Sequence, residues 1–312
     1  MMKKNKPLVI IGGATAVGKT GLSVEMAKAI DGEIISADSM QVYRGMDIGT
    51  AKIREEEMKG IAHYLIDEVD PDFDFNVFEF KKRAEHYINI ILEKDRIPIL
   101  TGGTGFYIQS VLYDIDFSNE ENGNEYRERL EEADAAKLYE MLKEIDPASA
   151  ANIHPNNKKR VIRALEFYHN TGSLISEHNE RQRNKTSPYE YVYFVLNRNR
   201  EKIYERVEKR VDIMIEQGLE DEVRSLLESG LSEDAPSMQA IGYKEMVSYL
   251  KGNITYDEAI SLIRLNTRHF AKRQITWFRR EKEAVWINYE DYSDEDEMLM
   301  AMINILKEKN IV

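Results

Sequence analysis

The stretch Pro7-Leu-Val-Ile-Ile-Gly-Gly-Ala-Thr-Ala-Val-Gly-Lys-Thr20 decides the fold class of this 312-residue chain. Its first five residues are apolar, as is typical of a buried strand. Gly13–Thr20 then fits the spacing G-x-x-x-x-G-K-[ST], in which successive backbone N–H groups form a cradle for an anion. Residues 21–30 have the pattern of a helix. Strand, glycine-rich loop and helix in this order predict a phosphate-binding loop.

Two side chains of this loop have separate expected roles. Lys19 places a positive charge on the outer phosphates, and the hydroxyl of Thr20 is a ligand for Mg²⁺, the cofactor that we expect. The loop by itself does not identify the reaction. The predicted phosphate-binding residues are Gly13, Thr15, Ala16, Val17, Gly18, Lys19 and Thr20.

Further strand candidates recur along the chain, with helical segments between most of them. Residues 76–94 have helical spacing, and Asn76 is the expected N-cap. This alternation predicts an α/β fold of the phosphate-loop type, in which a parallel sheet has helices on both faces and ligands bind at the carboxyl ends of its strands. The strand candidates are residues 8–11, 33–38, 63–67, 97–101, 189–196 and 285–288.

The strand-and-helix pattern is interrupted in the middle of the chain. Residues 116–185 contain a polar loop and short polar helices without a strand signal. We therefore predict a helical insertion domain over 116–185, and a core domain formed by 1–115 and 186–312.

Composition excludes several classes of protein. The chain has no cysteine, so it cannot form disulfides, thiolate metal sites or a thiol nucleophile. No apolar run approaches 18 residues, so we expect no membrane partner and a cytoplasmic location.

The chain has a net charge of −13, but some of its segments are locally basic. Residues 264–282 contain seven Lys or Arg and one acid. Arg264, Arg268 and Lys272 recur every four residues and predict one basic stripe on a helix. Such faces allow an acidic protein to bind a polyanion.

Asp38 is the candidate catalytic carboxylate. It ends the strand 33–38 and is expected next to the phosphate loop, where it either joins the Mg²⁺ shell or accepts a proton; capping a turn is the structural alternative. An NTPase has a metal-binding Asp after a second apolar strand, but residues 97–101 lead into Gly102-Gly-Thr-Gly105 without an acid. This departure argues against ATP hydrolysis.

The chain resembles the bacterial tRNA dimethylallyltransferases, also called tRNA isopentenyltransferases, of the IPP transferase family. The matching segments follow the family's order over nearly the whole chain. Eukaryotic members add a Cys/His zinc finger, which a chain without cysteine cannot have. The segments are GGATAVGKT (12–20), ISADSMQVYRGMDIGTAK (35–52), HYLID (63–67), PILTGGTGFY (98–107), IHPNNKKRVIRALE (153–166), QAIGYKEM (239–246) and AKRQITWFR (271–279).

This resemblance implies transfer of a dimethylallyl group from its diphosphate to N6 of adenosine 37, in tRNAs that read codons beginning with U. The phosphate loop would bind the diphosphate leaving group with Mg²⁺. Asp38 would accept the proton of the amine, Thr104 would assist there, and Lys19 would neutralise the leaving group. Arg224 is a further candidate for the diphosphate.

The resemblance also implies that the tRNA anticodon stem-loop is a partner of a chain that acts as a monomer. The insertion domain would take part in this contact. The residues implied to contact tRNA are Asp38, Ser39, Met40, Gln41, Thr104, Arg127, Lys159, Arg160, Arg163, Gln239, Gly242, Lys244, Lys272, Arg273, Gln274 and Arg279.

Three other functions stay open from the sequence. A small-molecule kinase would need tight ATP binding without affinity for the allylic diphosphate. A transferase acting on free adenine nucleotides would need neither the insertion nor the basic segments. A non-catalytic RNA-binding module of the GTPase type would function without the Asp38 carboxylate.

Overall fold

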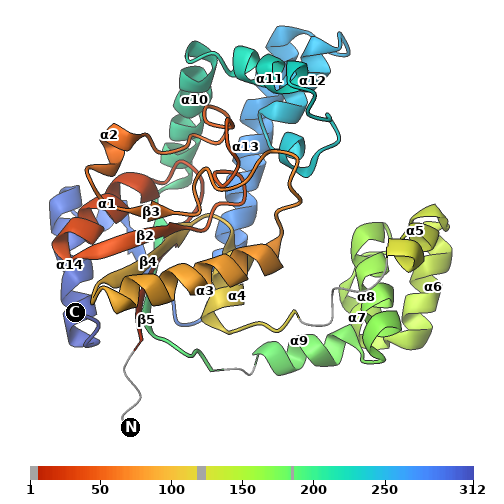
Figure 1. The fold of residues 1–312 in the computed structure, drawn as a ribbon, viewed down its shortest axis with the longest axis horizontal. Coiled ribbons are helices and arrows are strands. Elements are labelled where there is room, and N and C mark those ends of the chain that lie inside the picture. Colours follow the sequence, from red (N-terminus) through yellow and green to blue (C-terminus); the bar gives the residue numbers. More distant parts are fainter. Residues whose placement is uncertain (1–5, 118–123, 184–185) are drawn as a thin grey trace. The chain divides into compact units, whose positions relative to one another are not determined.

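The computed structural model describes residues 6–117, 124–183 and 186–312 (Figure 1). It divides into two compact units, one formed by Met1–Val111 with Tyr189–Val312 and the other by Leu112–Pro188. Parts of the predicted insertion domain, residues 118–123 and 184–185, lie outside the described residues.

The larger unit is built on a six-stranded, all-parallel sheet with the strand order β3-β2-β4-β1-β5-β6. This confirms the predicted α/β fold. β1 lies between β4 and β5, and its residues Leu8–Ile11 are fully buried, which explains the uninterrupted apolar run. The strands are β1 Pro7–Gly13, β2 Gly32–Ser36, β3 His63–Tyr64, β4 Ile97–Gly102, β5 Glu190–Asn197 and β6 Val285–Asn288.

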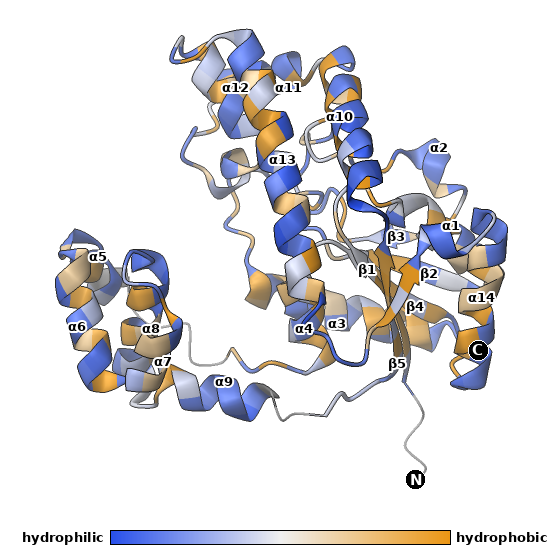
Figure 2. Ribbon diagram, turned by 180° about the vertical axis from the view of Figure 1, so that it is seen from behind, coloured by the Kyte–Doolittle hydropathy of each residue, from blue (hydrophilic) through white to orange (hydrophobic). Residues whose placement is uncertain are grey.

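Helices cover the sheet (Figure 2). α3 packs on β2 and β4, and α1 packs on the same two strands and on α14. α10 and α12 both pack along the long helix α13. The helices of this unit are α1 Lys19–Ala29, α2 Glu55–Met58, α3 Val77–Glu93, α4 Gly105–Leu112, α10 Arg200–Glu216, α11 Leu219–Glu228, α12 Tyr243–Leu250, α13 Tyr256–Phe278 and α14 Glu295–Glu308, with 3₁₀ turns η1 Pro236–Gln239 and η2 Tyr289–Asp291.

The smaller unit is helical and has a core of its own. Leu138, Leu142, Val161 and Leu165 are buried at its centre, where α6 packs against α8. Its helices are α5 Asn124–Glu132, α6 Ala135–Ile145, α7 Pro147–Asn152, α8 Lys158–Thr171 and α9 Ile175–Arg183. No helix in the described part of either unit is long and apolar enough to cross a membrane.

The first turn of α3 shows how the sequence sets a helix boundary. The predicted cap Asn76 accepts hydrogen bonds at its Oδ1 atom from the N–H groups of Phe78 (3.0 Å) and Glu79 (3.1 Å). Phe80, Ala84 and Ile88 then face the sheet and are fully buried. The cap and the apolar face together determine where α3 begins and which side it buries.

Replacing this cap tests the assignment. We expect Asn76→Ala to lower the free energy of unfolding by about 1 kcal/mol, because two N–H groups lose their acceptor. Urea unfolding followed by circular dichroism measures this change. Lys82→Ala, on the exposed face of the same helix, is the control and should shift the free energy by less than about 0.5 kcal/mol. Equal effects of the two substitutions would show that the cap contributes nothing.

Candidate active site

Two glycines of the phosphate loop pack closely against neighbouring residues. Gly13 has φ = 153°, and a Cβ atom there would lie 2.8 Å from the carbonyl oxygen of Leu196. Gly18 has φ = 114°, and its Cβ atom would lie 2.5 Å from the hydroxyl of Tyr289. Only glycine fits these positions, because both the backbone angle and the space exclude a side chain.

Lys19 lies at the start of α1 and folds back on its own loop. Its Nζ atom donates to the carbonyl oxygens of Gly13 (2.9 Å) and Ala14 (2.8 Å). Burial lowers the pKa of Lys19 to about 8, although the nearby charge of Asp38 opposes this shift. The loop therefore holds a cation that titrates near neutral pH.

Three arginines from the segment after β5 bind the same loop. Arg198 donates from Nε to the carbonyl oxygen of Val17 (2.9 Å), and Arg206 donates to that of Ala16 (2.6 Å). Arg210 donates to the Thr15 hydroxyl (3.1 Å) through one terminal nitrogen and to the Thr50 carbonyl (3.0 Å) through the other. None of these three arginines was among the residues predicted from the sequence. Arg206 and Arg210 are four residues apart, or about one helical turn. This spacing would have predicted that they lie on the same face of α10.

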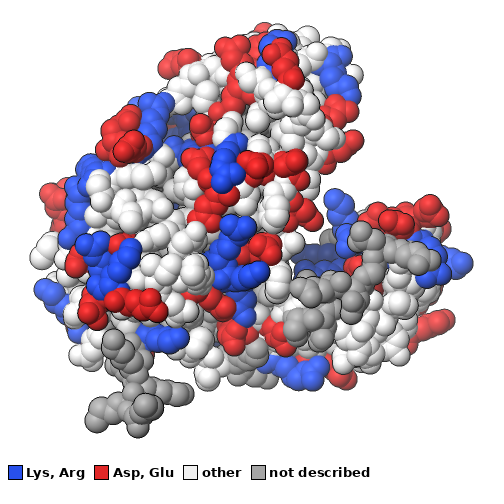
Figure 3. All heavy atoms as spheres, viewed as in Figure 1, with Lys and Arg blue, Asp and Glu red and all other residues white. Residues whose placement is uncertain are grey.

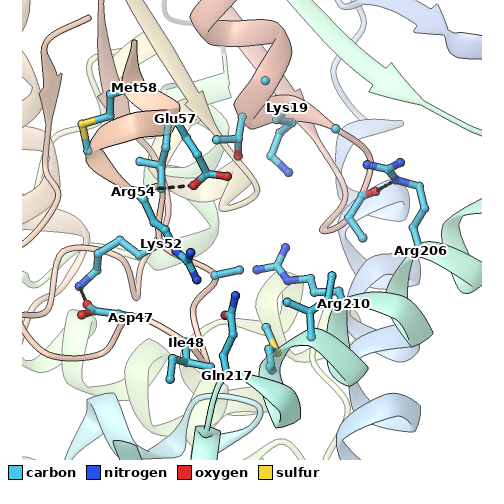
Figure 4. A pocket seen from close by; sticks show the side chains of 18 of the residues that line it. Lys19, Asp47, Ile48, Lys52, Arg54, Glu57, Met58, Arg206, Arg210 and Gln217 are labelled. Carbon is cyan, nitrogen blue, oxygen red and sulfur yellow. Dashed lines mark hydrogen bonds and ion pairs between the residues drawn. The ribbon is translucent and has the colours of Figure 1, made fainter. Parts of the chain in front are cut away.

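A cavity of about 900 Å³ opens in front of the loop. Lys19 and Arg210 both extend into it, as Figure 4 shows. Apolar side chains line other parts of its wall. Its lining includes the cations Lys19, Lys52, Arg54, Arg206, Lys209 and Arg210, the acids Asp47, Glu55, Glu57 and Asp67, and the apolar residues Ile48, Ile53, Met58, Ile213 and Met214. Lys52 is paired with Asp47 and Asp67, so the positive charge is concentrated at Lys19, Arg206, Lys209 and Arg210. Such a surface suits a small anion that carries a hydrocarbon group.

A second, smaller cavity adjoins the loop, and Asp38 lines it. The two cavities share the residues Lys19, Thr20 and Ile53. Asp38 accepts a hydrogen bond at Oδ1 from the N–H of Met40 (2.9 Å), which fixes the carboxylate in a turn after β2.

The loop after β4 lies beside the loop of Asp38. The N–H of Thr104 donates to the carbonyl oxygen of Ala37 (3.2 Å), and the N–H of Ala37 donates to that of Thr101 (2.7 Å). A Cβ atom on Gly102 would lie 2.2 Å from the Ala37 oxygen, so glycine is needed for this approach. The two backbone bonds join the loop of Thr104 to Ala37, the residue before Asp38.

The loop at residues 47–49 is held by a carboxylate from a distant helix, which the sequence did not reveal. Glu222 of α11 accepts hydrogen bonds from the N–H groups of Asp47 (2.8 Å), Ile48 (2.8 Å) and Gly49 (3.1 Å). The Tyr243 hydroxyl donates to it as well (2.6 Å). Glu222 thus fixes part of the cavity wall.

Arg224 lies elsewhere. It does not line either cavity, and it pairs with Glu220 (2.7 Å) on the exposed side of α11. Its sequence position, two residues from Glu222, turns it to another face of the helix. The arginine beside Lys19 is Arg210.

The predicted basic stripe on α13 needs correction. Arg264 forms ion pairs with Glu208 (3.1 Å) and Asp212 (2.5 Å) of α10, and Arg268 also pairs with Glu208. These two arginines hold α13 against α10, because acids of α10 recur at the matching spacing. Lys272 is exposed.

The other residues predicted to contact tRNA divide between the two units. In the smaller unit, Arg127 pairs with Glu131 and Glu166, while Lys159, Arg160 and Arg163 are exposed on α8. In the larger unit, Gln274 is buried. Also in the larger unit, Lys244, Lys272, Arg273, Arg279 and Gln239 are exposed, Gly242 is buried at the start of α12, and Ser39, Met40 and Gln41 are half-buried beside Asp38.

Comparison with known proteins finds relatives over almost the whole chain. Residues 41–281 match the family model described as IPP transferase. A tRNA dimethylallyltransferase from Lachnoclostridium phytofermentans is 53% identical over 311 residues, covering 98% of this chain and 99% of the relative.

Solved structures with the same fold were also found. The full-length tRNA isopentenylpyrophosphate transferase from Bacillus halodurans is 45% identical, with a TM-score of 0.76 and coverage of 98% of this chain and 97% of that one. A eukaryotic dimethylallyltransferase, described as acting on tRNA, is 29% identical, with a TM-score of 0.86 and coverage of 98% of this chain and 80% of that one.

The lowered pKa of Lys19 makes anion binding depend on pH. Above pH 8 the amine loses its proton, so we expect the affinity for sulfate, a phosphate mimic whose own charge is constant there, to fall by about tenfold between pH 7 and pH 9. Isothermal titration calorimetry measures the affinity. Lys19→Arg is the matched control and should give a flat profile, since arginine stays protonated. A wild-type profile as flat as that of the variant would contradict the assignment.

Proposed function

Because the chain belongs to the IPP transferase family, we propose that it is a tRNA dimethylallyltransferase. It transfers the dimethylallyl group of dimethylallyl diphosphate to N6 of adenosine 37 in tRNAs that read codons beginning with U. The products are N6-(dimethylallyl)adenosine and diphosphate. The observation that carries the proposal is the meeting of two cavities at Lys19 and Thr20, one cationic and the other lined by Asp38.

The cationic cavity is suited to the leaving group. As the bond between C1 of the dimethylallyl group and the diphosphate oxygen breaks, its electron pair stays on the diphosphate. Lys19, Arg210 and the free N–H groups at the start of α1 neutralise this charge, and they are positioned before the reaction begins. Departure is thereby favoured without a rearrangement of the loop.

Asp38 is suited to receive the proton. N6 of the adenine forms the new bond to C1, and its proton moves to the carboxylate of Asp38. The hydrogen bond from the Met40 N–H keeps this carboxylate in place. Thr104, whose N–H donates to the carbonyl oxygen of Ala37, would orient the amine through its hydroxyl.

The residues present fit Mg²⁺. Thr20 supplies a hydroxyl oxygen, a hard donor, to the wall of the cavity that Asp38 also lines. No group of three or more acids or histidines with metal-ligand geometry occurs in the described segments, so substrate phosphates and water would complete the shell. When bound, Mg²⁺ would add positive charge for the departing diphosphate.

Recognition of the anticodon stem-loop completes the proposal. Exposed basic side chains on α8 and near the end of α13 can neutralise tRNA phosphates, with Lys159, Arg160, Lys272 and Arg279 as examples. The base has to leave its stack to reach the cavity of Asp38. We infer further that the chain acts as a cytoplasmic monomer.

A direct assay tests this function. Incubation of the protein with labelled dimethylallyl diphosphate, Mg²⁺ and unmodified tRNA, followed by nucleoside analysis, should yield labelled N6-(dimethylallyl)adenosine. Partial nuclease digestion of the labelled tRNA should locate the label at position 37. EDTA should abolish the label in tRNA. Replacing tRNA by AMP should give no product. Label in AMP instead of tRNA would indicate a transferase for free nucleotides, and phosphate transfer from ATP without prenyl transfer would indicate a kinase.

Removal of the Asp38 carboxylate tests its role. We expect Asp38→Asn, which keeps an acceptor for the Met40 N–H, to lower kcat by at least about 100-fold, and Asp38→Ala to lower it similarly. The affinity for tRNA, measured by filter binding, should stay within about twofold of the wild type. A parallel loss of affinity and turnover would contradict a role as the base.

A further inference from the structure

Gln274 is a buried amide that lies between the loop of Thr15 and the loop of Gly103. It lies on α13 with 6% of its surface exposed. Its Oε1 atom accepts a hydrogen bond from the N–H of Thr15 (2.8 Å), and its Nε2 atom donates to the carbonyl oxygen of Gly103 (3.0 Å). Both ends of the amide are therefore occupied by backbone groups.

The orientation of this amide follows from its partners. A backbone N–H can only donate and a backbone carbonyl can only accept, so Oε1 has to face Thr15 and Nε2 has to face Gly103. The fit at Gly103 is close, because a Cβ atom there would lie 2.2 Å from Nε2. With one hydrogen bond at each end and 6% of its surface exposed, Gln274 offers little surface to tRNA.

The two bonded loops carry different parts of the proposed chemistry. Thr15 belongs to the phosphate loop, which also carries Lys19. Gly103 precedes Thr104, whose N–H is bonded to the carbonyl oxygen of Ala37, the residue before Asp38. One side chain thus connects the site of the leaving group with the site of the proton acceptor.

We propose that Gln274 is a positioning residue that sets the distance between the phosphate loop and the loop of Thr104 and Asp38. This inference rests on the proposed prenyl transfer. The two loops have to present the diphosphate and the amine to the same carbon atom, and a displacement of about 1 Å costs roughly 100-fold in rate. Gln274 contacts neither reacting group and acts through the loops.

Gln274→Glu offers a test that depends on pH. Near pH 8 the ionised Glu side chain has no proton to donate, so two acceptors face each other at Gly103. When the buried carboxyl is protonated, its O–H can donate to the Gly103 carbonyl while the other oxygen accepts from Thr15. We expect kcat of Gln274→Glu relative to wild type to be about 10- to 100-fold lower at pH 8 and to recover toward pH 6.

Two further variants separate positioning from simple instability. Gln274→Met keeps the volume but loses both hydrogen bonds, and its relative kcat should be low at every pH. Gln109→Met removes a side-chain hydrogen bond from α4 to Glu281 that joins neither of the two loops, and its kcat should match the wild type. KM for tRNA should stay within about twofold in all three variants.

Hydrogen exchange measured by mass spectrometry supplies a readout without substrates. Peptides covering 12–20 and 101–107 should both exchange faster in Gln274→Met than in wild type, and in Gln274→Glu they should do so at pH 8 but not at pH 6. Unchanged exchange, a wild-type kcat in Gln274→Met, or a pH-independent deficit in Gln274→Glu would overturn the inference. If the exchange results are as expected but the wild type does not prenylate tRNA, the proposed function is wrong, while the role of Gln274 in joining the two loops is supported.

Discussion

The structure depends on the close packing of the phosphate loop against the elements around it. Gly12, Gly13 and Gly18 each leave no space for a Cβ atom, since Phe278, Leu196 and Tyr289 occupy that space. Because β1 lies between β4 and β5, the loop emerges at the centre of the carboxyl edge of the sheet. This position places the loop of Lys19, and the pairing of β2 with β4 brings Asp38 to the same edge.

The same packing explains how an acidic protein keeps a cationic site. Acidic and basic side chains are mixed over the face shown in Figure 3, and the net charge of the chain is −13. At the phosphate loop, however, four carbonyl oxygens, those of Gly13, Ala14, Ala16 and Val17, accept hydrogen bonds from Lys19, Arg206 and Arg198. Local backbone dipoles hold these cations, so the site does not depend on the overall charge.

The sequence predicted those features that are encoded within a short segment. Every strand except the two-residue β3 contains apolar residues in sequence, and Asn76 with the apolar face of α3 defined that helix. Lys19, Thr20 and Asp38 lie within motifs next to strands, so the parallel sheet was sufficient to predict that they meet. Arg210 and Gln274 were different, because they reach Thr15 across 195 and 259 residues. On a long amphipathic helix, a buried and an exposed polar residue have the same local pattern, and only the packing of α10 and α13 distinguishes them.

Helix α13 shows why charge alone was a poor guide to surface function. The four-residue spacing of Arg264 and Arg268 indicated a basic stripe, but Glu208 and Asp212 on α10 pair with these two side chains. The neutral Gln274 on the same helix reaches the phosphate loop instead. An arginine or lysine at that position would add donors but could not accept the Thr15 N–H, and a carboxylate could not donate to Gly103. A side chain that joins a donor on one loop to an acceptor on the other has to offer both functions, and an amide of this length does so without a charge.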